Sequence, residues 1–256
     1  QRQLRIAGIS PSKISKILIS HWHGDHVWGL PGLLQTISSS QKSTPIEIYG
    51  PKGTKEFLNN MTKAFSSYSK IEINAHEILK ECQICYTKAY QIYAIPVRHT
   101  THCLAYYFNE NDKRKINLEY TKKFGLIKHK LLGNLQKGET IEYNGQKITP
   151  AEGTIKIAGK KITFLLDHTK TKDLEKFAEN SDILISEATL SEKLKPKAEA
   201  RMHSTAKQAA ELAKKAKVKE LILTHFSQRY KTTHELEDEA KKVFKNTTMA
   251  KDFLTI

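Results

Sequence analysis

The fold and the chemistry of this chain are decided by the stretch Ile19-Ser20-His21-Trp22-His23-Gly24-Asp25-His26. It begins inside the apolar run Lys16–Ser20, whose β-branched content predicts a buried strand. Because side chains alternate along an extended chain, His21 and His23 lie on one side, and the last two residues follow after the glycine turn. Imidazole nitrogens and carboxylate oxygens are typical ligands of zinc. The stretch therefore predicts a metal site, with enough ligands to contribute to two ions.

Further candidate ligands stand at the ends of other predicted strands, because one segment cannot close two zinc sites. They are His99 after Ile92–Val97, Asp167 after Ile162–Leu166 and His225 after Leu221–Thr224. A single histidine or aspartate at such a position is usually structural. In α/β sheets, however, functional groups collect at strand ends, so these three are expected to converge on the histidine-rich stretch.

The rest of the chain alternates between strand-like and helix-like patterns. Predicted strands are Lys16–Ser20, Ile46–Tyr49, Ile71–Asn74, Tyr90–Val97, Lys161–Leu166, Ile183–Ser186 and Leu221–Thr224. Predicted helices are Thr54–Phe65, Thr171–Glu179, Thr205–Lys217 and His234–Phe244. Strands that alternate with helices indicate an α/β protein, and we expect one domain over residues 1–256.

The composition excludes several classes of protein. Of 256 residues, 39% are hydrophobic and 27% are charged, which is enough apolar material for a folded core. No apolar run approaches the length of a membrane span, and no secretion signal opens the chain. The three cysteines cannot build a disulfide framework, so a cytoplasmic location is expected. Cys82 and Cys85 face opposite sides of a strand-like stretch and are interpreted as structural.

The net charge of +15 favours a polyanionic partner, with nucleic acid ahead of a membrane surface. Only six of the 42 basic residues are arginine, so a general lysine bias of composition would also explain the charge. Two basic segments stand out. Lys193–Lys219 is a candidate phosphate-contact face. Asn111–Gln146 has weak periodicity and eight basic against four acidic side chains, and it is interpreted as an inserted, projecting arm.

His-x-His-x-Asp-His is typical of the metallo-β-lactamase fold, and the residues around it resemble the ribonuclease Z family of tRNA 3′-processing endonucleases. The resemblance covers essentially the whole chain. Its motifs are Val27–Leu34, Tyr49–Gly53, His99 with Ala105-Tyr106, Asp167, Ser186–Thr189, His203–Thr205 with Gln208–Ala210, and Leu223–Tyr230. It implies a four-layer αβ/βα sandwich.

The resemblance also implies a set of metal ligands for two zinc ions per chain. His21, His23 and His99 would hold one ion, Asp25, His26 and His225 the other, and Asp167 would bridge them. The two ions would share a hydroxide that attacks the phosphodiester. His102 is close to His99, but Tyr106 keeps the family's spacing from His99, which is therefore preferred.

Three residues match the family's proton-handling groups. Asp25 would orient or deprotonate the nucleophile, and His203, supported by Glu187, would protonate the leaving 5′ oxygen of the trailer or stabilise the pentacovalent phosphate. His203 is expected to be charged when RNA is bound, because two anions outweigh the dipole of the helix that follows.

The family further implies that precursor tRNA is the substrate and that the protein is a homodimer, in which the arm of one subunit serves the other's active site. Neither a nucleotide cofactor nor a membrane partner is expected. Expected RNA-binding residues are Lys113, Arg114, Lys115, Lys122, Lys123, Lys128, Lys130 and Arg229.

The chain departs from the family pattern in several places. His168 follows Asp167 where the family usually has threonine, and it is expected to be exposed. The segment Gly125–Gly133 lacks the proline typical of the family's arm tip. The family also begins with about fifty residues, including early strands, before the position of Gln1, so the natural product is expected to be longer.

Two alternatives stay open. One is a metallohydrolase of a small ester, thioester or phosphodiester, which would need neither basic segment. The other is a non-catalytic RNA-binding relative with a decayed site, which the complete ligand set disfavours.

Overall fold

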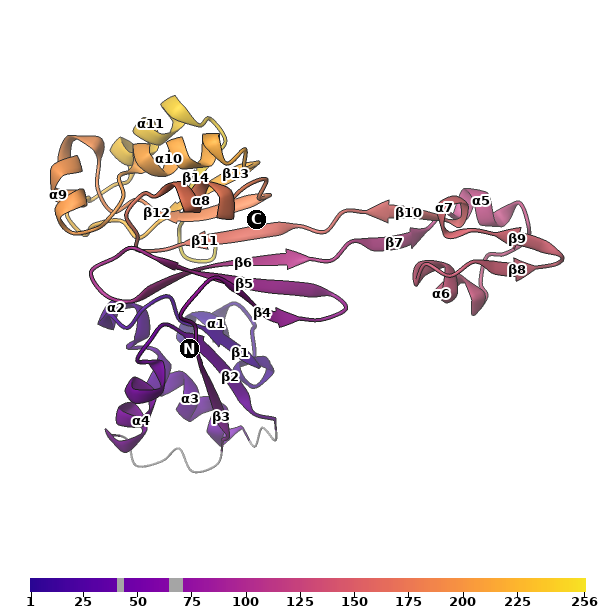
Figure 1. The fold of residues 1–256 in the computed structure, drawn as a ribbon, viewed down its shortest axis with the longest axis horizontal. Coiled ribbons are helices and arrows are strands. Elements are labelled where there is room, and N and C mark those ends of the chain that lie inside the picture. The colour runs from indigo at the N-terminus through magenta and orange to yellow at the C-terminus, as the bar shows by residue number, and fades with distance from the viewer. Residues whose placement is uncertain (41–43, 65–70) are drawn as a thin grey trace. The chain divides into compact units, whose positions relative to one another are not determined.

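The computed structural model describes residues 1–40, 44–64 and 71–256. These residues form two compact units (Figure 1). The first unit consists of Gln1–Cys85, Ile92–Phe108 and Lys161–Ile256, and the second of Tyr86–Gln91 and Asn109–Lys160. In the described part of the chain, no helix has the length and apolarity that crossing a membrane requires.

The N-terminal half of the first unit contains a parallel three-stranded sheet with helices on one face. The sheet has the order β1 (Lys16–Leu18), β2 (Ile46–Gly50) and β3 (Ile73–Glu77). Alternate residues of β2, Ile46 and Ile48, are fully buried against α3 (Leu30–Ser39) and α4 (Thr54–Ala64). The last residue of the predicted helix Thr54–Phe65 lies outside the described residues.

The second sheet of this unit has seven strands in the order β14-β13-β12-β11-β6-β5-β4. Their bounds are β4 (Cys82–Tyr86), β5 (Tyr90–Val97), β6 (Cys103–Glu110), β11 (Lys161–Leu165), β12 (Ile183–Glu187), β13 (Glu220–Thr224) and β14 (Thr247–Met249). The four strands β11 to β14 are parallel. Three helices pack on this sheet: α8 (Lys172–Phe177), α10 (Ala206–Lys215) and α11 (His234–Val243).

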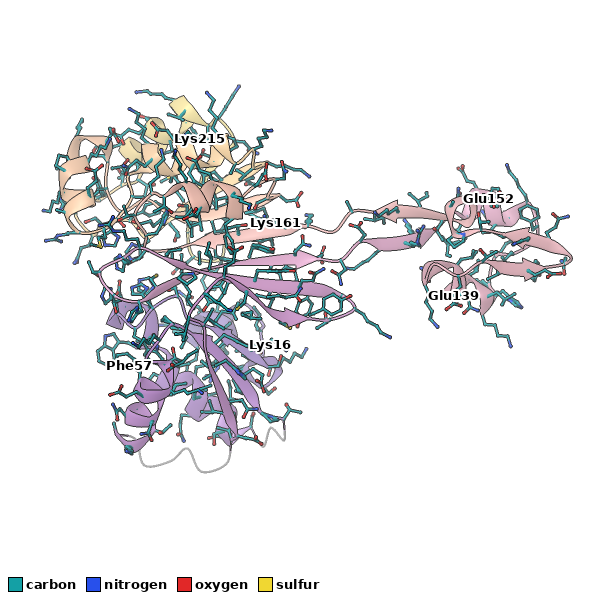
Figure 2. The ribbon with its side chains drawn as sticks, in the orientation of Figure 1. Lys16, Phe57, Glu139, Glu152, Lys161 and Lys215 are labelled. Atoms are coloured by element: carbon teal, nitrogen blue, oxygen red, sulfur yellow. The ribbon has the colours of Figure 1, made fainter. Side chains whose placement is uncertain are left out.

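Helix α10 shows why these elements form. Its alanine stripe at 206, 209, 210 and 213 is buried against Leu221 and Leu223 of β13, so small side chains let the helix approach the sheet closely. The capping box predicted at its start is present, since Thr205 and Gln208 satisfy each other's backbone N–H groups. Near its other end lies Lys215, which Figure 2 labels. Lys215 Nζ lies 3.0 Å from Glu175 Oε1 of α8.

The two sheets of the first unit face each other through an apolar layer. Ala94, Leu104 and Tyr106 of the larger sheet pack against Leu18 of β1 and Ile78. The Tyr106 hydroxyl donates a 2.7 Å hydrogen bond to the carbonyl of Ile19. Helices therefore cover the outer faces of two inner sheets (Figure 1), which confirms the predicted αβ/βα sandwich.

The second unit contains the segment Asn111–Gln146 and has a core of its own. Strands β7 (Lys113–Ile116) and β10 (Thr154–Ile157) form an antiparallel ladder, and β8 (Ile141–Tyr143) pairs with β9 (Gln146–Ile148). Three short helices complete it: α5 (Leu118–Lys122), α6 (Leu131–Gln136) and α7 (Pro150–Gly153). Leu126, Leu135, Ile141 and Ile148 are buried together, so the weak periodicity of this segment conceals a packed cluster.

The remaining elements are short. They are α1 (Arg2–Ile6), α2 (Gly24–Val27), α9 (Lys195–Ala200) and the 3₁₀ turns Pro11–Lys13 and Glu192–Leu194.

Candidate metal centre

The histidine-rich stretch leaves the sheet at the end of β1 and is fixed there by the opposite sheet. Leu104 donates its backbone N–H to the carbonyl of Ser20 at 2.8 Å, next to the bond from Tyr106 to Ile19. His21 is fully buried, and α2 begins at Gly24. The turn into α2 therefore brings ligand atoms before and after the glycine to one place.

The structure brings all seven predicted ligands into two groups. In each group, the ligand atoms lie within 4.8 Å of one another. The first consists of His21, His23, His99 and Asp167, and the second of Asp25, His26 and His225. The first is almost entirely buried, whereas the side chain of Asp25 is 66% exposed, so the second group opens to solvent.

Asp167 stands between the two groups and turns a different oxygen to each. Its Oδ2 lies 3.6 Å from His21 Nε2 and 3.5 Å from His99 Nε2. Its Oδ1 lies 3.6 Å from His26 Nε2 and 3.2 Å from His225 Nε2. Burial raises the pKa of this carboxyl, but the surrounding imidazoles outweigh burial and hold its pKa far below the usual range. Asp167 is therefore an anion placed to serve both groups.

Several atoms at the centre are buried and have no hydrogen-bond partner among the described residues: His26 Nε2, His99 Nε2 and Asp167 Oδ1. A buried polar atom without a partner is costly, and a bound cation removes that cost. Burial, followed by the charge of His26, lowers the pKa of His21 to about 3, so His21 is a neutral imidazole with a lone pair to donate. The centre thus fits a divalent metal held by nitrogen and oxygen ligands.

Hydrogen bonds on the far side of the rings fix the orientation of the imidazoles. His99 donates from Nδ1 to the carbonyl of Met202 at 3.0 Å, which leaves its Nε2 as the lone-pair atom. His225 Nδ1 lies 2.9 Å from Thr189 Oγ1. Such partners set the tautomer and aim the ligand nitrogen. Neither Met202 nor Thr189 was predicted from the sequence to contribute.

His225 also has an unusual backbone. It follows directly on Thr224, the last residue of β13, with φ at 57°. Met202 has φ at 54°. Side chains other than glycine rarely adopt this left-handed conformation, and residues that do are often held at functional sites by their surroundings. The sharp turn at His225 lets its ring leave the sheet edge at once, towards Asp167.

A buried carboxylate, Glu187, organises the side of the centre next to His203. It accepts hydrogen bonds from the backbone N–H of His168 at 2.7 Å, from Thr189 Oγ1 at 2.6 Å and from His203 Nδ1 at 3.1 Å. Burial raises the pKa of Glu187, but the hydrogen bond from His203 leads the effects that lower it overall. Glu187 is thus ionised and holds His203 directly and His225 through Thr189.

His203 is held close to both metal groups. Its ring centroid lies 5.1 Å from that of His99 and 5.5 Å from that of His225. Burial lowers its pKa, but the hydrogen bond and the charge of Glu187 outweigh burial and raise the pKa above its ordinary value. The carboxylates around His203 therefore favour the imidazolium, and its charge with RNA bound stays a prediction.

The expectation for His168 was wrong, because its side chain is buried rather than exposed. The Nδ1 atom of His168 lies 2.8 Å from the carbonyl of Leu166. The hydroxyl of Ser204 donates a hydrogen bond to the backbone carbonyl of His168. His168 therefore joins the Asp167 turn to the His203 loop. These bonds fix the turn at Asp167 from both sides.

The remaining predicted residues lie on the surface. Arg229 is exposed and donates from Nε to Ser227 Oγ, and His102 is exposed and joins neither metal group. In the second unit, Arg114 is half-buried and bonds Thr154 Oγ1. The lysines there are exposed: Lys113, Lys115, Lys122, Lys123, Lys128 and Lys130.

The basic face Lys193–Lys219 is partly neutralised. Lys193 lies 3.0 Å from Glu235, Lys215 3.0 Å from Glu175 and Lys219 2.6 Å from Asp182. These ion pairs reduce the charge available to an anionic partner, so the face is weaker than its sequence indicates. Cys82 and Cys85, both on β4, are free thiols.

Comparison with known proteins decides the family. Residues 1–118 match the family model described as the beta-lactamase superfamily domain. Ribonuclease Z of Lactococcus lactis is 38% identical over 259 residues, which covers 98% of this chain and 84% of that protein. Ribonuclease Z of Methanothermobacter thermautotrophicus is 35% identical over 258 residues, covering 100% and 83%. The chain belongs to the ribonuclease Z family.

Solved structures agree with this membership. The short form of human tRNase Z is 26% identical and has a TM-score of 0.69, with 100% of this chain and 83% of that chain covered. The metallo-β-lactamase fold and the ribonuclease Z resemblance that were inferred from the His-x-His-x-Asp-His stretch and its flanking motifs are therefore confirmed.

Proposed function

We propose that this chain is a zinc-dependent endoribonuclease that cleaves the 3′ trailer from precursor tRNA and leaves a 3′-OH on the tRNA. Membership of the ribonuclease Z family makes it a metal-dependent endoribonuclease of tRNA 3′ processing. The observation that carries the finer proposal is Asp167, whose two oxygens face two separate histidine groups. A carboxylate in that position suits a centre with two ions.

The proposed ligand sets are His21, His23 and His99 for one zinc and Asp25, His26 and His225 for the other, with Asp167 shared. Zinc bound there would supply the positive charge that activates water and neutralises the anionic phosphodiester. The chain's own contribution is to keep the imidazoles neutral and aimed. Burial keeps His21 neutral. The bonds from His99 to Met202 and from His225 to Thr189 aim the ligand nitrogens of those two rings.

Proton handling is assigned to Asp25 and His203. Asp25 is exposed and close to His26 and His225, at 3.4 Å from each, so it can orient a water that enters from solvent. Because the product carries a 3′-OH, the bond that breaks joins phosphorus to the tRNA's 3′ oxygen, so the expectation that the trailer's 5′ oxygen is the leaving group was wrong. His203 gives its proton to that oxygen, and Glu187 holds the Nδ1 side of the ring and favours its charged form.

Recognition of the tRNA body is assigned to the second unit. Its exposed lysines are suited to phosphate contacts, which position a substrate without reading its bases. Its packed core gives these lysines a fixed support. We further propose a homodimer in the cytoplasm, in which this unit of one subunit contacts the tRNA cleaved by the other.

The test is incubation with a 3′-extended precursor tRNA and with bis(p-nitrophenyl) phosphate, each with and without chelator. We expect cleavage of both, a 3′-OH on the tRNA product, and loss of both activities in chelator. Hydrolysis of the small diester alone would favour the small-molecule hydrolase. Binding of the precursor without cleavage, in protein loaded with zinc, would favour the non-catalytic relative.

A further inference from the structure

A cavity of about 780 Å³ lies beside the metal centre in the first unit. His99 is part of its wall, so the cavity begins at the first metal group. The rest of its wall comes from the end of β5, the loop that follows it and the start of β6 (residues 96–104), from Pro51 and Lys52 after β2, and from Ile78 and Leu79 after β3. We call it the His99 cavity.

The lining of the His99 cavity has two kinds of surface. Lys52 and Arg98 supply positive charge, and the residues described as lining it include no aspartate or glutamate. Ile78, Pro96 and Leu79 supply an apolar wall, and Leu79 leaves 68% of its surface exposed. An apolar wall next to unopposed positive charge suits a ligand that has both a flat apolar part and an anionic part. A nucleotide is such a ligand, and the volume is in the range of ordinary ligand pockets.

Arg98 also lines a second cavity of about 390 Å³, together with Thr169, Lys170 and His203. Arg98 therefore lines both the His99 cavity and the cavity that contains His203. Its backbone carbonyl accepts a hydrogen bond from the N–H of Thr169 at 2.8 Å. Arg98 is exposed, so an incoming anion can reach its side chain, and Glu199 also lines the second cavity.

We infer that Arg98, together with Lys52, binds the trailer phosphate that follows the scissile phosphate. The nucleotide that joins these two phosphates then lies in the His99 cavity. This inference rests on the proposed function, and in particular on His203 as the donor to the tRNA's 3′ oxygen. That role puts the tRNA end of the scissile bond on the His203 side. The trailer then extends away from His203 into the adjoining His99 cavity. Arg98 is thus a positioning residue.

Trailer length provides the sharpest test. A precursor with one trailer nucleotide lacks the phosphate that Arg98 binds, whereas one with five nucleotides has it. Arg98→Ala should lower kcat/KM about tenfold on the five-nucleotide trailer, as expected for one charged hydrogen bond, and have much less effect on the one-nucleotide trailer. Arg5→Ala, an exposed arginine on α1, is the matched control and should affect neither. Equal losses on both trailers would overturn the inference.

Binding to the metal-free protein separates this inference from the proposed function. The probe is a fluorescent single-stranded RNA pentanucleotide, titrated into chelator-treated protein at several salt concentrations. Arg98→Ala should weaken binding about tenfold and reduce the salt slope by about 0.7, the value for one phosphate contact on a single strand. Leu79→Ala should weaken binding without changing the slope, and Ile9→Ala is its exposed apolar control.

The two failures look different. If the wild-type protein cleaves no precursor tRNA but Arg98→Ala still changes the salt slope of pentanucleotide binding, the proposed function fails and the cavity remains a nucleotide site. If the wild type cleaves the precursor and Arg98→Ala changes neither the slope nor the dependence on trailer length, the inference is wrong.

Discussion

Replacing Glu187 by glutamine is expected to disturb both stability and catalysis, because its carboxylate accepts three hydrogen bonds in a fully buried position. Glutamine keeps one acceptor oxygen and introduces an NH2 group. If the oxygen stays with the N–H of His168, the NH2 group faces Thr189 and His203. The hydroxyl of Thr189 can rotate, but Nδ1 of His203 must lose its proton to accept. The substitution therefore forces His203 into the neutral form with its proton on Nε2.

The size of the effect follows from these bonds. Hydrogen bonds to charged groups contribute about 1.5–3 kcal/mol each, and at least one is lost, while the desolvation cost of the buried carboxylate is relieved. We expect the free energy of unfolding of the metal-free protein to fall by about 1.5–3 kcal/mol. Loss of a general acid should lower kcat on precursor tRNA by about 10²-fold or more.

The pH dependence has a definite sign. The pKa of His203 is raised in the folded protein, so its pairing with Glu187 stabilises the fold fully below the unfolded pKa of about 6.5 and is lost as pH rises through the folded pKa. The destabilisation caused by Glu187→Gln should therefore be larger at pH 6 than at pH 9.

Urea unfolding at both pH values measures the stability, and long-range ¹H–¹⁵N NMR of the histidine rings measures the tautomer. Glu211→Gln is the control, since this carboxylate pairs with Lys170 at the surface and should cost at most about 1 kcal/mol. A Glu187→Gln protein within 0.5 kcal/mol of wild type, with normal turnover, would show that Glu187 does not organise the centre.

The metal centre and the second unit lead to three further expectations. Zinc-loaded protein should contain two ions per chain by metal analysis, and Asp167→Ala should lose both because Asp167 faces both groups; an active wild type with one ion would contradict this. Asp25→Ala should lower kcat far more than it weakens substrate affinity, and normal turnover would remove Asp25 from the chemistry. Residues 115–155 can be replaced by Asn-Gly, which should close the β7–β10 ladder at the paired residues Arg114 and Lys156. This variant should bind precursor tRNA more weakly and with a flatter salt dependence, yet still hydrolyse bis(p-nitrophenyl) phosphate. An unchanged salt slope in a folded variant would move the tRNA contact elsewhere.

The sequence was most informative where a strand-like pattern of apolar residues is followed by a side chain that can bind a metal. The seven predicted strands are all present within a few residues, because each has an apolar or alternating run rich in β-branched or aromatic residues. The ligands were found for the same reason, since His99, Asp167 and His225 each come within two residues of the end of such a run. Helix α3 was not predicted, because Pro31 and Gly32 at its start read as a turn, although proline is well tolerated there.

What the sequence did not predict depends on contacts between distant segments. Thr189 has no pattern that reveals its bond with His225, since this bond exists only once β12 and β13 are side by side. His168 looked like a surface residue because its partners, Glu187 and Ser204, are far away in sequence. The core of the second unit was hidden because its buried residues come from elements too short to show a period.

The order of the ligands along the chain has a consequence for biosynthesis. Residues from position 21 to position 225 must meet before the centre exists, and the last of them leaves β13 in a left-handed turn. A chain synthesised only as far as β3 already contains His21, His23, Asp25 and His26, but it lacks His99, Asp167 and His225, so neither group is complete. If hydrolysis needs both groups, as proposed, an unfinished chain has no competent centre while it is beside the ribosome's own RNA.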